Sequence, residues 1–205
     1  MTTTPLTPAE AGTLINALGN AERSAEAPLL ARLAQWLATA GIDDIRRADW
    51  PVRRDEQRFL QLSLSNGMLA LQRNDVDRRA MLWVRNGHGG AALWLDGREV
   101  GVPRDPDDGS PLTELAGGWI SDQVYAIEVA PQNHPLADWT QGFSGLQYGL
   151  LIADVCTGRS RLEMPGPAER WKSPKLDEAE GGTWRLYADE DAAAAGRVAR
   201  VVPAF

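Results

Sequence analysis

Short apolar runs separated by turn residues constrain the fold of this chain most, and they fill the sequence from about residue 59 onward. Asn66-Gly67 stands between two such runs, as do Asp96-Gly97 and Thr157-Gly158 further along. Asn, Asp and Gly accept the positive φ angles of a tight hairpin turn. Consecutive hairpins favour strands that pair with their neighbours in the chain. The pattern therefore predicts an antiparallel β-meander over residues 51–205.

The stretches 120–129 and 150–162 resemble the hairpins of a propeller blade. The likeness covers about one blade, and too little β sequence remains for an ordinary propeller. It supports the meander topology and leaves open a sandwich-like or a partial-propeller-like sheet. The segment 165–182, with its Pro and Gly residues, is expected to be mostly loop.

Two amphipathic helices are predicted in the first 50 residues. Thr7, Pro8 and Glu10 form a capping-box pattern at the start of the first helix. The second is expected over residues 25–40, with Ser24 as its cap and Pro28 in its first turn. Their apolar faces suit docking on a sheet, so we expect a mainly β (α+β) fold with two N-terminal α-helices packed against it.

One domain over residues 1–205 is expected from the chain length, with a helical segment at 1–50 and the β region at 51–205. The start of the sequence lacks a basic and apolar leader pattern, and no apolar run is long enough to span a bilayer. We therefore expect a cytoplasmic protein that does not enter a membrane. A single cysteine excludes an internal disulfide.

Negative charge is concentrated in the second half of the chain. Residues 105–205 hold sixteen Asp and Glu against eight Lys and Arg, and the whole chain carries a formal charge of −7. Such a surface repels phosphate backbones, which disfavours nucleic acid, and it can steer a basic protein partner. Asp105, Asp107 and Asp108 are the acidic candidates for partner binding. The preference for Arg over Lys, with many Ala residues, indicates a GC-rich bacterial source.

Candidate catalytic groups are few. His134, Asp138 and Ser144 share the predicted loop 131–145 and are weak candidates for a hydrolase site. The Gly pattern around Ser144 departs from a nucleophile elbow, and members of a triad rarely come from one short loop. No phosphate-binding loop and no metal-ligand spacing is present, so the sequence predicts no cofactor and no metal.

Eight tryptophans are the most unusual feature of the composition. Trp36, Trp83, Trp94 and Trp184 lie within predicted regular elements and are expected in the core. Trp139, Phe143 and Trp171 lie in predicted loops. Exposed aromatic side chains there would bind a protein partner or stack on a sugar, and the alternative is that they fold back and cap the core.

Together these patterns favour binding over catalysis. The leading hypothesis is a bacterial protein-binding module, in its specific form an immunity or antitoxin-type protein that covers a toxic effector. A hydrolase with its site in the 131–145 loop is the first alternative. A carbohydrate-binding module that uses the loop tryptophans is the second.

Overall fold

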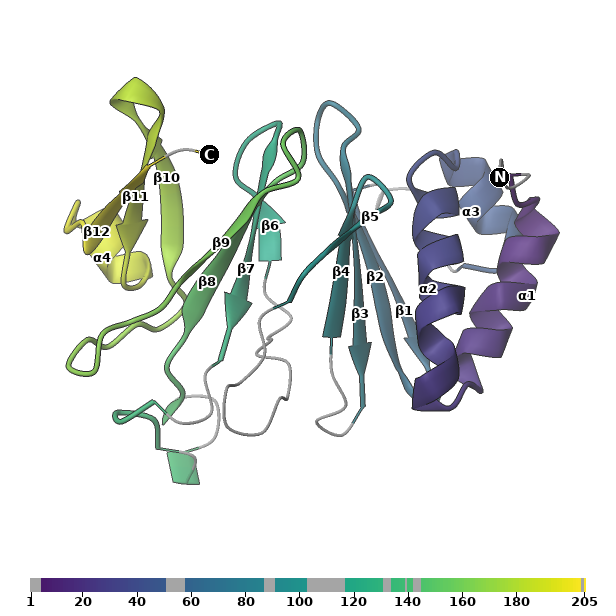
Figure 1. The fold of residues 1–205 in the computed structure, drawn as a ribbon, viewed down its shortest axis with the longest axis horizontal. Coiled ribbons are helices and arrows are strands. Elements are labelled where there is room, and N and C mark those ends of the chain that lie inside the picture. Colours follow the sequence, from purple (N-terminus) through teal and green to yellow (C-terminus); the bar gives the residue numbers. More distant parts are fainter. Residues whose placement is uncertain are drawn as a thin grey trace. The chain divides into compact units, whose positions relative to one another are not determined.

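The computed structural model describes residues 5–50, 58–86, 91–102, 117–130, 134–138, 140–141, 145–203 and 205. Figure 1 shows the order of the elements. The helices are α1 (Pro8–Gly19), α2 (Arg23–Leu37), α3 (Ile42–Arg47), α4 (Glu190–Ala194) and the short 3₁₀ helix η2 (Glu180–Gly182). The strands are β1 (Phe59–Leu64), β2 (Gly67–Arg73), β3 (Arg79–Arg85), β4 (Ala91–Leu95), β5 (Arg98–Val100), β6 (Gly117–Trp119), β7 (Val124–Val129), β8 (Gly149–Asp154), β9 (Ser160–Glu163), β10 (Lys175–Ala179), β11 (Thr183–Tyr187) and β12 (Arg200–Pro203).

Within each of three sheets, the described strands pair antiparallel in chain order. Their orders are β1-β2-β3-β4-β5, β6-β7-β8-β9 and β10-β11-β12, so the predicted meander and the mainly β class are confirmed. The chain forms two compact units, Met1–Gly101 and Val102–Phe205. The expectation of a single domain over 1–205 stays a prediction. No helix among the described residues is both long and apolar enough to cross a membrane.

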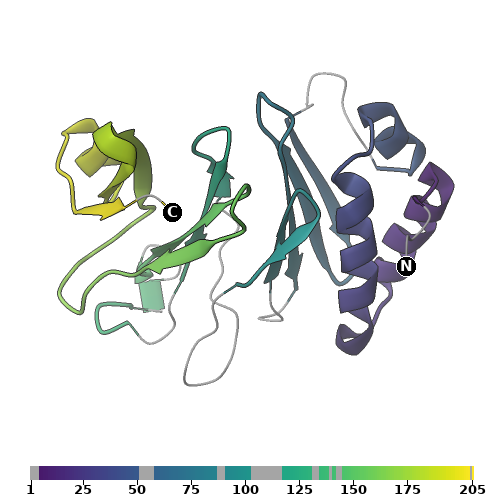
Figure 2. The same cartoon turned by 45° about the horizontal axis from the view of Figure 1, so that its top comes forward.

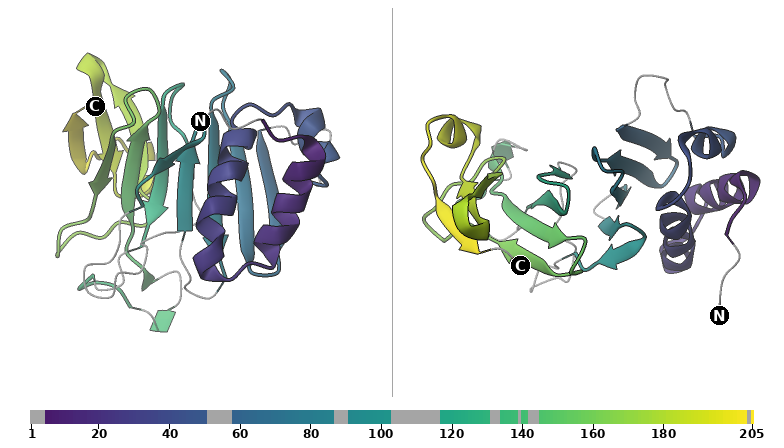
Figure 3. Two further views of the ribbon diagram at one scale, coloured as in Figure 1. Left: turned by 45° about the vertical axis from the view of Figure 1, so that its right-hand side comes forward. Right: turned by 90° about the horizontal axis from the view of Figure 1, so that it is seen from above.

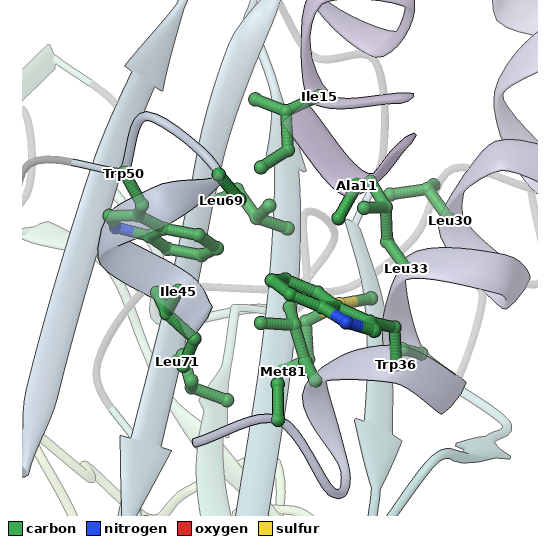
Figure 4. Packing of buried hydrophobic residues seen from close by; sticks show 14 of the residues in the cluster. Ala11, Ile15, Leu30, Leu33, Trp36, Ile45, Trp50, Leu69, Leu71 and Met81 are labelled. Carbon is green, nitrogen blue, oxygen red and sulfur yellow. The ribbon is translucent and has the colours of Figure 1, made fainter. Parts of the chain in front are cut away.

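In the first unit, the helices cover one face of the five-stranded sheet (Figure 3). Strand alternation directs Leu69, Leu71, Met81, Trp83 and Trp94 toward them, and these side chains form one core with the apolar faces of α1, α2 and α3. Figure 4 shows part of this core at close range, with Trp36 of α2 and Trp50 after α3. The predicted docking of the N-terminal helices on the sheet is confirmed.

The capping box of α1 is present as predicted, because Thr7 and Glu10 exchange hydrogen bonds across the first turn. The start of α2 was predicted wrongly: the helix begins at Arg23, its N-cap residue is Glu22, and Pro28 lies in its second turn. A proline at this position removes one N–H bond, to the carbonyl of Ser24. Ser24 is exposed, so water can satisfy that carbonyl and the helix tolerates the proline.

Two of the three predicted turns at a glycine differ in structure. Asp96 and Gly97 both have positive φ, at 46° and 77°, as a tight hairpin turn requires. Asn66 and Gly67 do not, and the turn expected at this pair lies one residue earlier, because β1 ends at Leu64 and Gly67 is the first residue of β2. A Cβ at Gly67 would lie 2.5 Å from the ring of Trp83, so this glycine is required by close packing.

In the second unit, two sheets share one core. It joins Val124 and Ala126 of β7 and Leu150 and Ile152 of β8 to apolar side chains of β10, β11 and β12, Trp184 among them. Figure 2 shows α4 beside β10–β12. All four tryptophans predicted in regular elements are buried. The unit therefore has a two-layer core.

The segment 165–182 was predicted to be mostly loop, and residues 165–174 are loop, whereas the rest of the segment forms β10 and η2. Its Pro and Gly residues mark the ends of the strand. Pro174 directly precedes β10, and Gly181 and Gly182 have positive φ in the turn to β11. Pairing along the whole length of β11 outweighs the weak β propensity of the β10 sequence.

Candidate functional site

A buried carboxylate lies in the middle of the second unit. Glu128 belongs to β7, a strand with neighbours on both sides and no exposed residue. Strand alternation puts Glu128 on the same face as Val124 and Ala126, and it is only 9% exposed. Burying a carboxylate costs free energy unless partners compensate, so its position needs an explanation.

The described residues offer Glu128 one hydrogen-bond donor. The hydroxyl of Ser173 donates to Glu128 Oε1 at 2.5 Å. Ser173 has a φ of 54°, a left-handed backbone conformation that residues other than glycine rarely adopt. Such backbone strain persists where the surrounding structure fixes it, and it is frequent at binding sites.

The residues before Ser173 hold this conformation in place. Trp171 N–H donates to the side-chain oxygen of Gln147 at 3.1 Å, and the Trp171 carbonyl accepts from Tyr148 N–H at 3.2 Å. Lys172 N–H donates to the carbonyl of Ala188 at 2.8 Å. The segment is thus tied to the chain just before β8 and just after β11, and the serine hydroxyl has a defined position.

Glu128 and Ser173 line a pocket of about 550 Å³. This volume falls within the range of small-molecule sites, roughly 300–1,000 Å³. The walls are mostly apolar and come from β6, β7, β8, β10 and α4: Gly117, Gly118, Ile120, Ala126, Leu150, Pro174, Leu176, Ala193 and Ala194.

The charged lining of the pocket is predominantly acidic. Besides Glu128 it contains Asp177, Glu190 and Lys175. The ion pairs found among the described residues of the second unit join Arg200 to Glu163 and to Glu169, and none includes a pocket residue. The pocket therefore holds three carboxylates against one ammonium, without internal neutralisation by ion pairs.

Two glycines on β6 shape one wall. At Gly117 a Cβ would lie 2.7 Å from the hydroxyl oxygen of Tyr125, so only glycine fits beside this buried ring. Burial raises the pKa of the Tyr125 phenol, which keeps it neutral. At Gly118 a Cβ would meet no atom within 4 Å, and its partner in the register is Ala126. The space in front of Gly118 is thus open.

The predicted triad does not form within the described residues. His134 Nδ1 accepts from Leu136 N–H at 3.2 Å, and Nε2 lies 3.1 Å from the carbonyl oxygen of Gly166. Asp138 accepts from Thr140 and Gln141, and these bonds, chiefly from the Thr140 hydroxyl, lower the pKa of its carboxyl. Asp138 thus serves its local turn, and His134 links its own turn to the chain at Gly166. Ser144 lies outside the described residues.

The predicted partner-binding residues divide into two groups. Asp105, Asp107, Asp108, Trp139 and Phe143 lie outside the described residues, so their roles stay predictions. For Trp171, the structure bears out the alternative that a loop tryptophan folds back into the core, since it is 1% exposed, and it is therefore not a partner-binding surface residue. It packs in the core of the second unit, with the guanidinium carbon of Arg200 5.0 Å from its ring centroid.

The comparisons with known proteins identify no relative. No family model matches the chain, and no curated protein or solved structure matches it significantly. Within the part of the chain that the structure describes, no group of three or more His, Cys, Asp or Glu side chains is placed to hold a metal ion.

Sequence reasoning missed Glu128 and Ser173. A signal for Glu128 was present, because Val-Tyr-Ala-Ile-Glu-Val reads as a buried strand in which Glu128 shares the parity of two apolar residues. An acid in such a position is rare without a role. Ser173 carried no comparable signal, since its left-handed φ depends on contacts with segments distant in the sequence.

Proposed function

We propose that this chain is a protein-binding module that takes a basic partner on an acidic surface of its second unit. We define this surface by the exposed carboxylates of β10, η2 and α4: Asp177, Glu178, Glu180, Glu190 and Asp191. The observation that carries the proposal is that none of the five makes an ion pair with a described residue. Unpaired exposed charges remain available to a partner.

The chemistry of the partner follows from this charge. Exposed carboxylates that form no ion pair raise the rate of encounter with a positive surface and disfavour negative ones. In its specific form, the proposal is a bacterial immunity or antitoxin-type protein that covers the basic active region of a toxic effector. The structural roles of His134 and Asp138 support binding over hydrolysis, and the burial of Trp171 removes one platform for a sugar.

Charge reversal tests the proposal. Proteins captured by the wild-type chain from a lysate of its source would be compared with those captured by Glu178→Lys/Glu180→Lys, two exposed carboxylates of this surface. The matched control is Glu22→Lys/Glu99→Lys, which changes the charge equally at exposed positions of the first unit. We expect the first variant to lose a basic partner that the control retains, with about tenfold or greater weakening when the purified partner is titrated.

Two outcomes would contradict the proposal. One is equal capture by all three proteins, and the other is equal loss in both variants, which would reflect net charge alone. The immunity form makes a further demand, namely that the captured partner inhibits growth and that co-expression of the wild-type chain, but not of the reversed variant, relieves the inhibition.

A further inference from the structure

The pocket of the second unit has one unsatisfied group at its wall. Glu128 receives a hydrogen bond at Oε1 from Ser173, and its other carboxylate oxygen receives none from the described residues. The side chain is about nine-tenths buried, but this second oxygen is not fully buried, so a group that enters the pocket can reach it. A carboxylate held in this way by a strained serine is prepared to accept a donor that enters the pocket.

The charge of the pocket selects the kind of donor. Asp177 and Glu190 add two carboxylates to Glu128, and Lys175 is the single cation of the lining. Lys175 forms no ion pair with any described residue, so it does not neutralise Glu128. A cationic donor is therefore favoured over a neutral one, because charge-assisted hydrogen bonds are about twice as strong.

The apolar walls of the pocket favour an apolar group attached to the cationic head of the ligand. Leu150 and Leu176 are buried beside the pocket, Ala126 lies next to Glu128 on the same face of β7, and Gly118 leaves open space opposite Ala126. These surfaces offer apolar contact and no further buried charge. A volume of about 550 Å³ is larger than a bare ammonium ion needs and accommodates an attached alkyl chain.

We propose that this pocket binds an organic cation, an ammonium or guanidinium head on a short alkyl stem, with the head against Glu128 and the stem between β6, β8 and β10. The site goes beyond the proposed function and does not depend on it. The cation has two possible sources, a free small molecule or a Lys or Arg side chain of a protein, and the experiment separates them.

Isothermal titration calorimetry tests the site with defined probes. n-Butylammonium and n-butylguanidinium supply the head and the stem, whereas n-butanol and butyrate have the stem with a neutral or a negative head. We expect both cations to bind the wild-type chain and neither control compound to do so. Binding of butanol as strong as that of butylammonium would overturn the proposal.

Three variants place the cation in this pocket. Glu128→Gln keeps the shape of the side chain and an acceptor for Ser173, and it should weaken butylammonium binding at least about tenfold. Lys175→Met removes the competing charge and should strengthen it. Gly118→Leu fills the open space and should abolish it, without strain, since a Cβ there meets nothing within 4 Å.

Each variant has a matched control. Glu180→Gln removes an exposed carboxylate that does not line the pocket, and Gly101→Leu adds a side chain at a glycine whose Cβ would also meet no atom within 4 Å. Both should bind like the wild type. Unchanged binding in Glu128→Gln and in Gly118→Leu would overturn the site. If Glu128→Gln fails to fold, the other two variants still test the site, because Lys175→Met should strengthen butylammonium binding and Gly118→Leu should abolish it.

The source of the cation is decided by one further probe, N-acetyl-lysine-N-methylamide. It carries the lysine side chain on a blocked backbone. Binding equal to that of butylammonium assigns the pocket to a basic side chain of a protein, and binding at least tenfold weaker assigns it to a free molecule. A failure of the charge-reversal capture experiment would leave these titrations unaffected, so the two proposals fail separately.

Discussion

Two buried glutamates show how the surroundings of one side chain separate a structural role from a binding role. Glu26 of α2 accepts from Asn66 Nδ2 and from Trp83 Nε1, each at 3.3 Å, and from the guanidinium of Arg85. Among the described residues, Glu128 accepts a hydrogen bond from the hydroxyl of Ser173 alone. A carboxylate with a counter-ion and several donors is satisfied in the folded protein, whereas one with a single donor retains capacity for a ligand.

The role of Glu26 predicts a large loss of stability in Glu26→Gln. The amide removes the charge opposite Arg85, which is only 22% exposed, and presents an NH₂ group to donors that need an acceptor. We expect the free energy of unfolding to fall by about 2–4 kcal/mol in urea titrations. Glu22→Gln, at an exposed N-cap without a side-chain bond, is the control and should change it by less than about 0.5 kcal/mol. If Glu26→Gln and Glu22→Gln lowered the free energy of unfolding equally, the structural role of Glu26 would be refuted.

Ser173→Ala tests the single bond to Glu128. Its removal leaves a buried carboxylate without a donor, so the free energy of unfolding should fall by about 1–3 kcal/mol. In a Glu128→Gln background the same change should cost less, since a neutral amide is less expensive to leave unpaired. Thermal or urea unfolding of the four proteins measures this coupling. Additive effects would show that the hydroxyl acts independently of the carboxylate.

At the scale of elements, one strand residue fixes the end of a helix. Arg79 of β3 is 6% exposed and donates from Nη1 to the carbonyls of Leu37 and Ala40, at 2.6 and 2.5 Å. Leu37 is the last residue of α2 and Ala40 lies in the turn after it, and unsatisfied acceptors and the helix dipole favour a cation at this end of a helix. Asp77 pairs with the same guanidinium at 3.0 Å. The sheet thereby determines where α2 stops.

This contact makes the stability of the first unit depend on pH. The hydrogen bond from Arg79 is the main cause that lowers the pKa of Asp77 in the folded chain. A lowered folded-state pKa contributes stability above the ordinary aspartate pKa, about 4, and this contribution is lost as the pH falls through the folded value. Asp77→Asn, which tolerates the φ of 62°, should lose less stability than the wild type on acidification below about pH 4.

The magnitude of this effect is limited by exposure. The Asp77 side chain is 53% exposed, so at neutral pH the variant should be less stable by under about 1 kcal/mol. Denaturant titrations at a series of pH values would measure the difference. Parallel pH profiles for the wild type and Asp77→Asn would contradict the assignment.

The elements also show what sequence patterns can predict. The capping box at Thr7 and the turn at Asp96-Gly97 depend on neighbouring residues, and both were predicted correctly. The hairpin at Asn66-Gly67 was predicted correctly, but its turn lies one residue earlier, and Asn66 has a tertiary role that sequence did not indicate: its Nδ2 donates to the Leu18 carbonyl at 2.8 Å, at the end of α1. Local chemistry is readable from sequence, whereas contacts between distant segments are not.

The same division applies to the site. The acidic character of the second half could be counted from the sequence, but the position of each acid could not. β10 was hidden by flanking Pro and Gly residues, so Asp177 was not expected on a strand that lines a pocket. To find Glu128 from the sequence, one must know which residues of β7 point to the same face. To find Ser173, one must know the folded backbone that gives it a positive φ.

At the scale of the whole molecule, the charge of −7 predicts a response to salt. Repulsion among like charges destabilises the compact state, and raising the ionic strength from about 0.01 M to 0.15 M shortens the Debye length from about 30 to 8 Å. We therefore expect the Tm of the wild type to rise by about 2–4 °C, equivalent to roughly 1 kcal/mol. Differential scanning calorimetry at the two salt concentrations measures the shift.

The distribution of the charge makes this prediction specific. Glu178→Lys/Glu180→Lys and Glu22→Lys/Glu99→Lys change the net charge equally, but only the first pair of substitutions acts where acids outnumber bases two to one, in residues 105–205. Repulsion is strongest among neighbouring charges, so the first variant should lose most of the salt response and the second should keep more of it. Equal responses would mean that net charge alone governs the effect. A larger loss in the first variant would show that the uncompensated acids of the second unit carry a cost in stability, which is the condition expected of a surface retained for a basic partner.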